Sequence, residues 1–201
     1  MTIKEVADSA ERHHRTLRLL ALIRSIAVQM QIQVRDAEDS ALHLASRVGA
    51  IGRAALTPIA AGTDLESLVL DELLVHSVHR SGIIVDGPPV RLNAKSAELV
   101  GLLIHELATN SVKFGALSKP HTQLRVIWWF SGLKDSRLRL EWSESGVRMP
   151  LAALRKPGFG SHIVKRLIAS ELHGEGDMLF LGEGILCIIE LPVGEVLLQY
   201  E

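Results

Sequence analysis

The sequence has one cysteine, few aromatic residues and no long apolar segment. Cys187 stands alone among 201 residues, which excludes an internal disulfide and a zinc site built from several cysteines. No apolar run approaches the ~20 residues that cross a bilayer, and the N-terminus does not have the pattern of a signal peptide. The formal net charge of -1 lacks the basic excess of proteins that bind nucleic acid or membrane surfaces. We therefore expect a cytoplasmic protein with no nucleic-acid or membrane partner, in which Cys187 is a small core residue.

The residues that are present predict a folded protein. Apolar residues make up 47% of the chain and charged residues 22%, a balance that supplies a core and argues against disorder. The length of 201 residues fits one domain or two small ones.

The first sixty residues predict two long helices. Neither glycine nor proline occurs between Lys4 and Asp36, and apolar residues recur there at helical spacing: Leu19, Ile23, Ile26 and Met30. A second stripe precedes Thr57-Pro58, where a helix ends, and consists of Ala41, Leu44, Val48, Ile51 and Ala55. Each stripe is too narrow to close a core alone. We expect a hairpin over residues 1–60 that two chains complete as a four-helix bundle, or that packs on the rest of its own chain.

Residues 61–201 predict a unit that mixes helices with strands. Thr63-Asp64-Leu65-Glu66 predicts a capping box at a helix start, and Asn93 is expected to cap a second helix. By pattern, helices are expected from the Thr63 cap to about residue 77, at 94–114 and at 161–172, and strands at 83–85, 90–92, 123–130, 137–143, 178–181 and 184–191. This mixture predicts an α+β sandwich with helices on one face of a mixed sheet.

Three polar residues share one face of the helix expected at 94–114. Glu106, Asn110 and Lys113 are four and three residues apart, which places them on one side. Such a face suits a Mg-triphosphate, because magnesium takes oxygen ligands and phosphates attract a cation. The spacing alone fits a solvated surface helix at least as well. His105-Glu106 begins the zinc motif His-Glu-x-x-His, but Thr109 stands at its last position, so a zinc site is not expected.

Two glycine-containing segments follow. Glu144 is expected at the end of a strand, two residues before Gly146, where a carboxylate could accept a hydrogen bond from an adenine amino group. The segment Gly158-Phe159-Gly160-Ser161 opens a helix. Its glycines would let the backbone approach an anion, and a helix N-terminus offers free N–H donors. A simple loop-to-helix turn is the alternative, and a lone Gly-x-Gly does not decide between them.

Together these segments resemble the HWE family of histidine kinases, which belong to the ATPases with the Bergerat nucleotide fold. The family is named for a His, a Trp and a Glu, here His105, Trp142 and Glu144. The resemblance covers residues 10–192 and rests on the specific run from His105 to Ser118. It implies a hairpin for dimerisation and histidine phosphotransfer, followed by a Bergerat-type α/β sandwich that binds ATP and Mg.

The resemblance also implies roles for individual residues. Glu106 stands where related ATPases keep an acidic base and where other histidine kinases have Asn, so it is a catalytic candidate. Residues implied to bind the nucleotide are His105, Asn110 (through Mg), Lys113 (phosphate), Glu144 (adenine), Gly146, Gly158, Phe159, Gly160 and Ser161.

The segment Glu11-Arg12-His13-His14-Arg15 resembles the family's phosphoacceptor box, Glu-x-x-His-Arg. The alignment makes His14, rather than His13, the acceptor. A neutral imidazole is abundant near neutral pH because its pKa is about 6.5, and it is a good nucleophile. Outside this context, a histidine on an exposed helix is usually only solvated.

The sequence departs from the family at two places. Leu17-Arg18 replaces the usual Lys-Asn pair, so a fixed cation stands one helical turn after the acceptor. Ser145-Gly146-Val147 stands where the family often has Gly-Gly-Pro, and the short stretch from Glu144 to Gly158 predicts a small ATP lid. These changes bear on activity more than on fold.

We therefore expect a two-component histidine kinase that phosphorylates His14 from ATP and passes the phosphoryl group to an aspartate of a response-regulator receiver domain. The chain has no room for a sensor domain, so input is expected from a separate protein. The alternative is a phosphotransfer or scaffold protein that kept the fold but does not hydrolyse ATP, as the departures at Leu17 and Arg18 suggest. A serine kinase or ATPase with the same nucleotide fold is a third reading, opposed by the His14 box and the hairpin.

Overall fold

The computed structural model describes residues 13, 15–17, 19–24, 26–27, 37–55, 62–76, 82–132, 136–147 and 159–198. The described residues between 13 and 27 are helical. The elements that follow are, in chain order, α2 (Ala37–Ala55), β1 (Thr63–Asp64), α3 (Leu65–His76), β2 (Ile83–Asp86), β3 (Arg91–Leu92), α4 (Ala94–Phe114), the 3₁₀ turn η2 (Ala116–Ser118), β4 (Gln123–Ser131), β5 (Arg137–Ser145), α5 (Phe159–His162), the π-helical turn η3 (Ile163–Leu167), α6 (Ile168–Leu172), β6 (Glu175–Leu181), β7 (Gly184–Pro192) and α7 (Val193–Val196).

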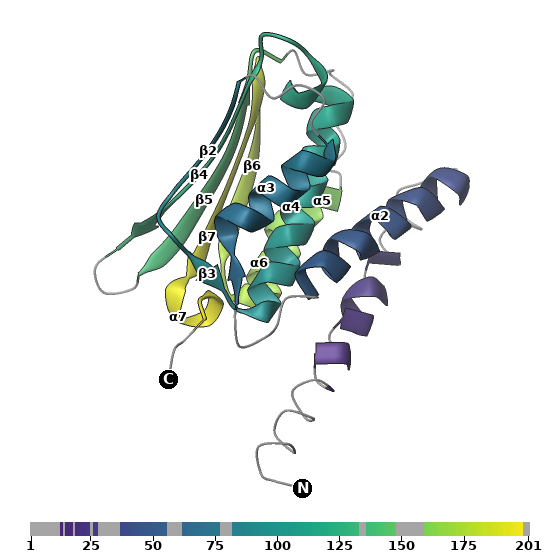
Figure 1. The fold of residues 1–201 in the computed structure, drawn as a ribbon, viewed down its shortest axis with the longest axis vertical. Coiled ribbons are helices and arrows are strands. Elements are labelled where there is room, and N and C mark those ends of the chain that lie inside the picture. Colours follow the sequence, from purple (N-terminus) through teal and green to yellow (C-terminus); the bar gives the residue numbers. More distant parts are fainter. Residues whose placement is uncertain are drawn as a thin grey trace, which may run out of the picture.

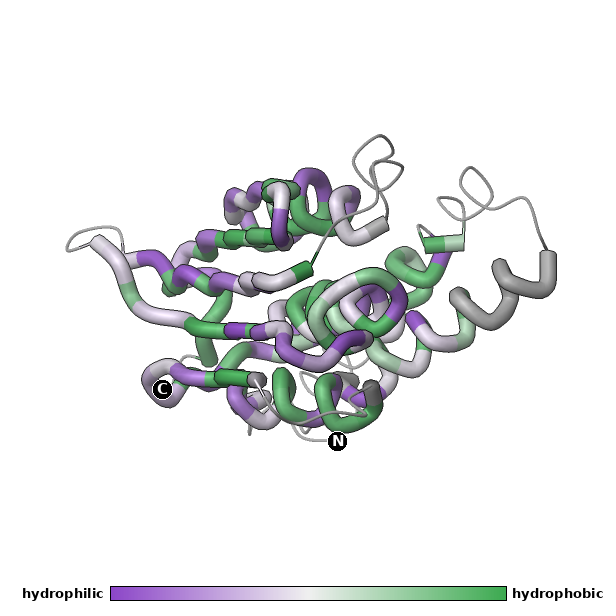
Figure 2. Tube along the Cα trace, turned by 90° about the horizontal axis from the view of Figure 1, so that it is seen from above, coloured by the Kyte–Doolittle hydropathy of each residue, from purple (hydrophilic) through white to green (hydrophobic). Residues whose placement is uncertain are grey.

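A five-stranded sheet in the order β2-β4-β5-β7-β6 forms one layer. β2 runs parallel to β4, and the other neighbouring strands are antiparallel. Along β5, the buried residues Leu138, Leu140 and Trp142 alternate with partly exposed ones, and the matching alternation of hydropathy is visible along the strands in Figure 2. One face of the sheet is therefore apolar and buried, as side-chain alternation in a strand requires. This confirms the predicted α+β sandwich with a mixed sheet.

Helices cover the buried face of the sheet. Figure 1 shows α3, α4 and α6 on that face and α2 on their far side, and α2 packs against α4. α4 is the central helix, and its residues Leu102, Leu103 and Ile104 have no exposed surface. α4 therefore lies between the sheet side of the core and the outer helix α2.

The predicted hairpin stripes contact the chain's own second unit. Ile26 is fully buried and Ile51 is 2% exposed, and both join the core cluster around α4. Met30 lies outside the described residues. The described part of the hairpin thus takes the second of the two arrangements expected from the sequence, in which the stripes pack on the rest of the same chain. Leu17 and Leu20 keep 51% and 57% of their surface exposed.

Two helix caps can be compared with expectation. Asn93 caps α4 as predicted, and its Oδ1 accepts a hydrogen bond from the Ser96 N–H at 2.9 Å. The capping box with Thr63 and Glu66 is wrong by one residue. Thr63 belongs to β1, where it pairs with β3, and Asp64 caps α3 by accepting from the Ser67 N–H at 2.9 Å. Thr63 is taken up by the short strand β1, which was not predicted, and the cap is therefore one residue later, at Asp64.

Smaller differences concern element bounds. The helix expected at 161–172 begins at Phe159 and contains the π-helical turn η3, and β6 begins at Glu175 rather than at residue 178. The short helix α7 was not expected. Cys187 is buried as expected, and burial, together with the charge of Asp177, raises the pKa of its thiol to about 12. Among the described residues, no helix is long and apolar enough to cross a membrane.

Candidate nucleotide site

The second half of α4 carries the polar face that the spacing predicted. Glu106 is 7% exposed, Asn110 is partly exposed, and Lys113 is exposed. The face therefore runs from the interior at Glu106 to solvent at Lys113. Because the three residues lie on one helix, their spacing is fixed by the backbone rather than by loop conformation.

The start of α5 meets this face at Gly160. A methyl group built on Gly160 would lie 3.7 Å from Glu106 Cβ and 3.8 Å from Asn110 Nδ2. Next to it, Ser161 is 7% exposed, and its hydroxyl lies 3.5 Å from the sulfur of Met178. The fold thus brings together two segments that the sequence singled out separately, with room for a methyl group in ordinary van der Waals contact between them.

Glu144, next to the last residue of the strand β5, is bound by groups of the protein itself. One carboxylate oxygen accepts from the Ala116 N–H at 2.7 Å, and the other accepts from the indole N–H of Trp142 at 2.9 Å. A Cβ on Gly115 would overlap the Glu144 carboxylate, so glycine is needed there for close approach. The indole of Trp142 therefore helps to fix the orientation of the Glu144 carboxylate. Each carboxylate oxygen still has a second lone pair for a further donor.

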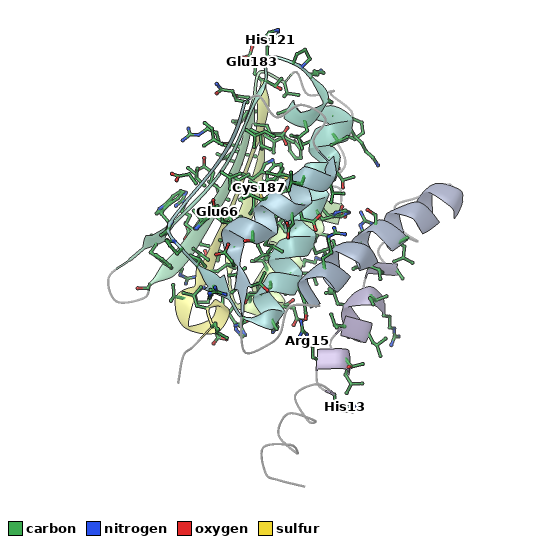
Figure 3. The ribbon with its side chains drawn as sticks, viewed as in Figure 1. His13, Arg15, Glu66, His121, Glu183 and Cys187 are labelled. Atoms are coloured by element: carbon green, nitrogen blue, oxygen red, sulfur yellow. The ribbon has the colours of Figure 1, made fainter. Side chains whose placement is uncertain are left out.

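Gly146 follows β5 in a left-handed conformation, with φ of 77°, which favours glycine. The next residue, Val147, donates its N–H to the Glu183 carbonyl in the β6–β7 turn at 3.1 Å. Figure 3 shows Glu183 beside His121 at one end of the molecule. Glu144 and Gly146 therefore belong to the end of the sheet where these turns gather.

His105 is buried and has protein partners at both ring nitrogens. Nδ1 lies 2.9 Å from Glu72 Oε2, and Nε2 lies 2.8 Å from the Ser46 hydroxyl. Burial opposes ionisation of Glu72, but hydrogen bonds from His105 and Arg53 outweigh it and hold the Glu72 pKa below its usual value. In this arrangement His105, which is 3% exposed, connects α4 to both α3 and α2.

A bidentate ion pair joins Glu106 to α2. Arg47 Nε and Nη2 donate to the two Glu106 oxygens at 2.6 Å and 2.8 Å. Neither Arg47 nor Glu72 was predicted from the sequence. A signal existed for Glu72, since it falls on the apolar face of α3 with Leu65, Leu68, Val69 and Leu73, where an isolated carboxylate needs a partner.

Three predicted site residues lie wholly or partly outside the described part of the chain. His14 and Gly158 lie outside the described residues, and for Phe159 the backbone alone is described. The residues beside His14 are placed: Arg15 Nε donates to Glu98 Oε1 at 2.9 Å, near the start of α4. Figure 3 shows His13 at the end of the molecule opposite Glu183.

Comparison with known proteins finds relatives of this chain among histidine kinases. It is 31% identical over 193 residues to blue-light-activated histidine kinase 1 of Erythrobacter litoralis (strain HTCC2594), which is 92% of this chain and 52% of the relative. It is 30% identical over 188 residues to the blue-light-activated histidine kinase of Rhizobium johnstonii, which is 90% of this chain and 52% of the relative. The chain is related to histidine kinases. It spans about half the length of these relatives.

Solved structures agree on the fold. The structure of a blue-light activated histidine kinase from Erythrobacter litoralis superposes with a TM-score of 0.60 at 19% identity, over 89% of this chain and 59% of that chain. Its isolated histidine kinase domain gives 0.53 at 19% identity, over 88% and 94%. No family model matches the sequence. The fold is therefore that of a histidine kinase domain.

Proposed function

We propose that this chain is an ATP-dependent protein-histidine kinase of the HWE type. The observation that carries the proposal is the meeting of Gly160 with Glu106 and Asn110, because it joins a phosphate-type helix start to an oxygen and amide face. In the proposal, Lys113 contacts the phosphates and Glu144 contacts adenine. Residues 1–60 then serve as the phosphotransfer hairpin and residues 61–201 as the ATP-binding unit.

The residues present fit magnesium held through the substrate. The described residues contain no group of three or more His, Cys, Asp or Glu that could hold a metal, and Glu106 is paired with Arg47. Asn110 offers an amide oxygen on the partly exposed side of α4. Magnesium commonly binds through one or two protein oxygens plus phosphate oxygens and water. When bound, it would neutralise charge on the transferring phosphoryl group.

The proposed reaction begins at His14. One ring nitrogen attacks the γ-phosphorus of ATP, the N–P bond forms, and the bond from phosphorus to the bridging oxygen breaks with its electrons going to ADP. The proton on the other ring nitrogen passes to Glu106. In the second step an aspartate oxygen of a response-regulator receiver domain attacks the same phosphorus, the P–N bond breaks, and the histidine takes back a proton.

The partners in this proposal follow from the chemistry. A receiver domain supplies the aspartate, and a sensor domain or protein supplies the input, as expected for a relative of longer kinases. Exposed Leu17 and Leu20 on the hairpin suit a homodimer contact, since apolar helix stripes are the usual material of bundles. Because the proposed reaction uses ATP and a receiver domain, we propose that it takes place in the cytoplasm.

A phosphotransfer or scaffold role without ATP hydrolysis is the second candidate. It is favoured by the internal pairing of both acidic residues of the site, Glu106 with Arg47 and Glu144 with Ala116 and Trp142. It agrees with the unusual Leu17-Arg18 pair of the acceptor box. Nucleotide binding separates the two candidates, because a scaffold has no need of it.

The test is labelling with γ-labelled ATP and Mg. We expect label on the wild type and on His13→Ala, and none on His14→Ala, with the bond stable in base and cleaved in acid. A His14→Ala protein that is labelled as fast as the wild type contradicts the acceptor. A folded protein that takes no label and binds no nucleotide favours the scaffold role.

A further inference from the structure

Two sulfur atoms lie side by side on the covered face of the sheet. The chain has four methionines and one cysteine, and in the part that the structure describes the residues with sulfur are Met178 and Cys187. Met178 of β6 is the direct cross-strand partner of Cys187 of β7, so both side chains point to the same face. Cys187 belongs to the core cluster under the helices, and Met178 packs against that cluster.

The two sulfurs differ in their reactivity towards a peroxide. Cys187 is 2% exposed, and burial, with the charge of Asp177, raises the pKa of its thiol to about 12. Because the thiolate is the form of cysteine that reacts, this thiol is inert near neutral pH. A thioether has no proton to lose, and its oxidation depends on access instead. Met178 is partly exposed and is therefore the sulfur of this pair that a peroxide can oxidise.

Met178 borders the space that the proposed function assigns to phosphate. Its terminal methyl carbon lies 3.7 Å from the position that a Cβ on Gly160 would take. Glu106 Cβ and Asn110 Nδ2 lie 3.7 Å and 3.8 Å from the same position. The space beside Gly160 is thus bordered by Met178 from the sheet and by Glu106 and Asn110 from α4.

The sulfur also contacts a hydrogen-bond donor of the same site. The Ser161 hydroxyl donates to Met178 Sδ at 3.5 Å, and Ser161 is 7% exposed. A thioether sulfur is a weak acceptor, so a phosphate oxygen can take over this hydroxyl. A sulfoxide is polar, and its oxygen would hold the hydroxyl far more firmly. Oxidation of Met178 would therefore withdraw a donor from the site and place a partly negative oxygen beside the phosphates.

We propose that Met178 is a modification site at which hydrogen peroxide forms methionine sulfoxide and thereby weakens nucleotide binding. The inference rests on the proposed kinase function. The sulfur gives a lone pair to one peroxide oxygen, the S–O bond forms, and the O–O bond breaks. The proton on the transferred oxygen passes to the departing hydroxide, which leaves as water. Sulfur is oxidised by two electrons and the peroxide is reduced, and a methionine sulfoxide reductase restores the thioether.

The first experiment measures nucleotide affinity before and after treatment of the full chain with hydrogen peroxide. Mass spectrometry locates each sulfoxide, and calorimetric titration with Mg and a non-hydrolysable ATP analogue gives the Kd. We expect sulfoxide at Met178 to raise the Kd about tenfold, as the loss of a hydrogen bond to a charged group predicts, and reductase treatment to reverse the change. An unchanged Kd with Met178 oxidised overturns the proposal. So does a loss of binding through unfolding, seen as a lost near-ultraviolet circular dichroism signal.

Met178→Leu is the matched control, because leucine conserves the volume and cannot be oxidised. This variant keeps the other sulfur residues of the chain: Met1, Met30, Met149 and Cys187. Its own Kd should be the same before and after peroxide. If its Kd rises as much as that of the wild type, another residue is responsible and the proposal is wrong.

The second experiment measures the rate of sulfoxide formation at Met178. A saturating Mg-bound analogue should slow this rate severalfold, because it fills the space beside Gly160, and an equal rate with and without the analogue overturns the proposal. If the untreated wild type binds no Mg-nucleotide, the proposed function fails. The oxidation site is then judged by itself: native Met178 should react within about tenfold of its rate in urea, since it is partly exposed. A native rate that is orders of magnitude slower than this refutes the site.

Discussion

Gly160→Ala separates a nucleotide site from an ordinary helix start. The added methyl group would lie 3.7–3.8 Å from its nearest neighbours on Glu106, Met178 and Asn110, which is ordinary van der Waals contact. The folded protein therefore accepts it without rearrangement. Because alanine has a higher helix propensity than glycine, the free energy of unfolding should be unchanged or rise by up to about 1 kcal/mol.

Nucleotide affinity should respond in the opposite direction. A methyl group in the space between Gly160 and Asn110 would displace a phosphate that approaches the backbone there. Hydrogen bonds to charged groups are worth about 1.5–3 kcal/mol, and partial loss of one corresponds to about tenfold weaker binding. We expect calorimetric titration with Mg and a non-hydrolysable ATP analogue to show a Kd raised by about this factor.

Gly194→Ala is the matched control for this change. Gly194 is the second residue of the four-residue helix α7, as Gly160 is of α5, and a methyl group there meets nothing within 4 Å. Figure 1 shows α7 near the C-terminus at the opposite end of the sheet from the β6–β7 turn. The control should share the stability change and keep the wild-type Kd. A Gly160→Ala protein that is folded and binds as tightly as Gly194→Ala would refute the placement of phosphates at α5.

Three further outcomes are expected. The Glu72 pKa is held below its usual 4.5, because hydrogen bonds from its histidine and arginine partners outweigh burial; its contribution to stability is therefore present above about pH 4.5 and lost as the pH falls through the folded-state pKa. Urea unfolding at several pH values should show this loss, and Glu72→Gln should abolish that component. Cys187, 2% exposed with a raised thiol pKa, should react with a thiol reagent in the native protein orders of magnitude more slowly than in urea, and equal rates would contradict its burial. Trp142→Phe removes the indole hydrogen bond to Glu144 and should lower the free energy of unfolding by about 1–3 kcal/mol, measured by denaturant titration; an unchanged midpoint would show that the bond contributes nothing.

Local sequence patterns predicted most elements of the fold. The alternation along β5 and the apolar period of α4 predicted these elements because the core needs an apolar face on each of them. The Asn93 cap was predicted because it is a contact between neighbours in the chain. Thr63 shows the limit of local rules: its partner in β3 is about thirty residues away, so the capping box that the sequence suggested gave way to a strand.

The sequence by itself determined which residues carry the candidate chemistry. The four-three spacing of Glu106, Asn110 and Lys113 fixes one helix face, and the specific run around them indicates a relative of histidine kinases. These are properties of residue type and helical period, and no tertiary contact is needed to see them.

The tertiary structure alone decided how those residues are partnered. Gly160 meets Asn110 because α5 packs on α4, and Glu106 is restrained because α2 brings Arg47 to it. Both contacts join residues at least fifty positions apart in the chain, where no periodicity links the partners. Burial then sets the free energy of these contacts, because each charged group removed from water needs a partner. Only the packed chain shows which groups are paired.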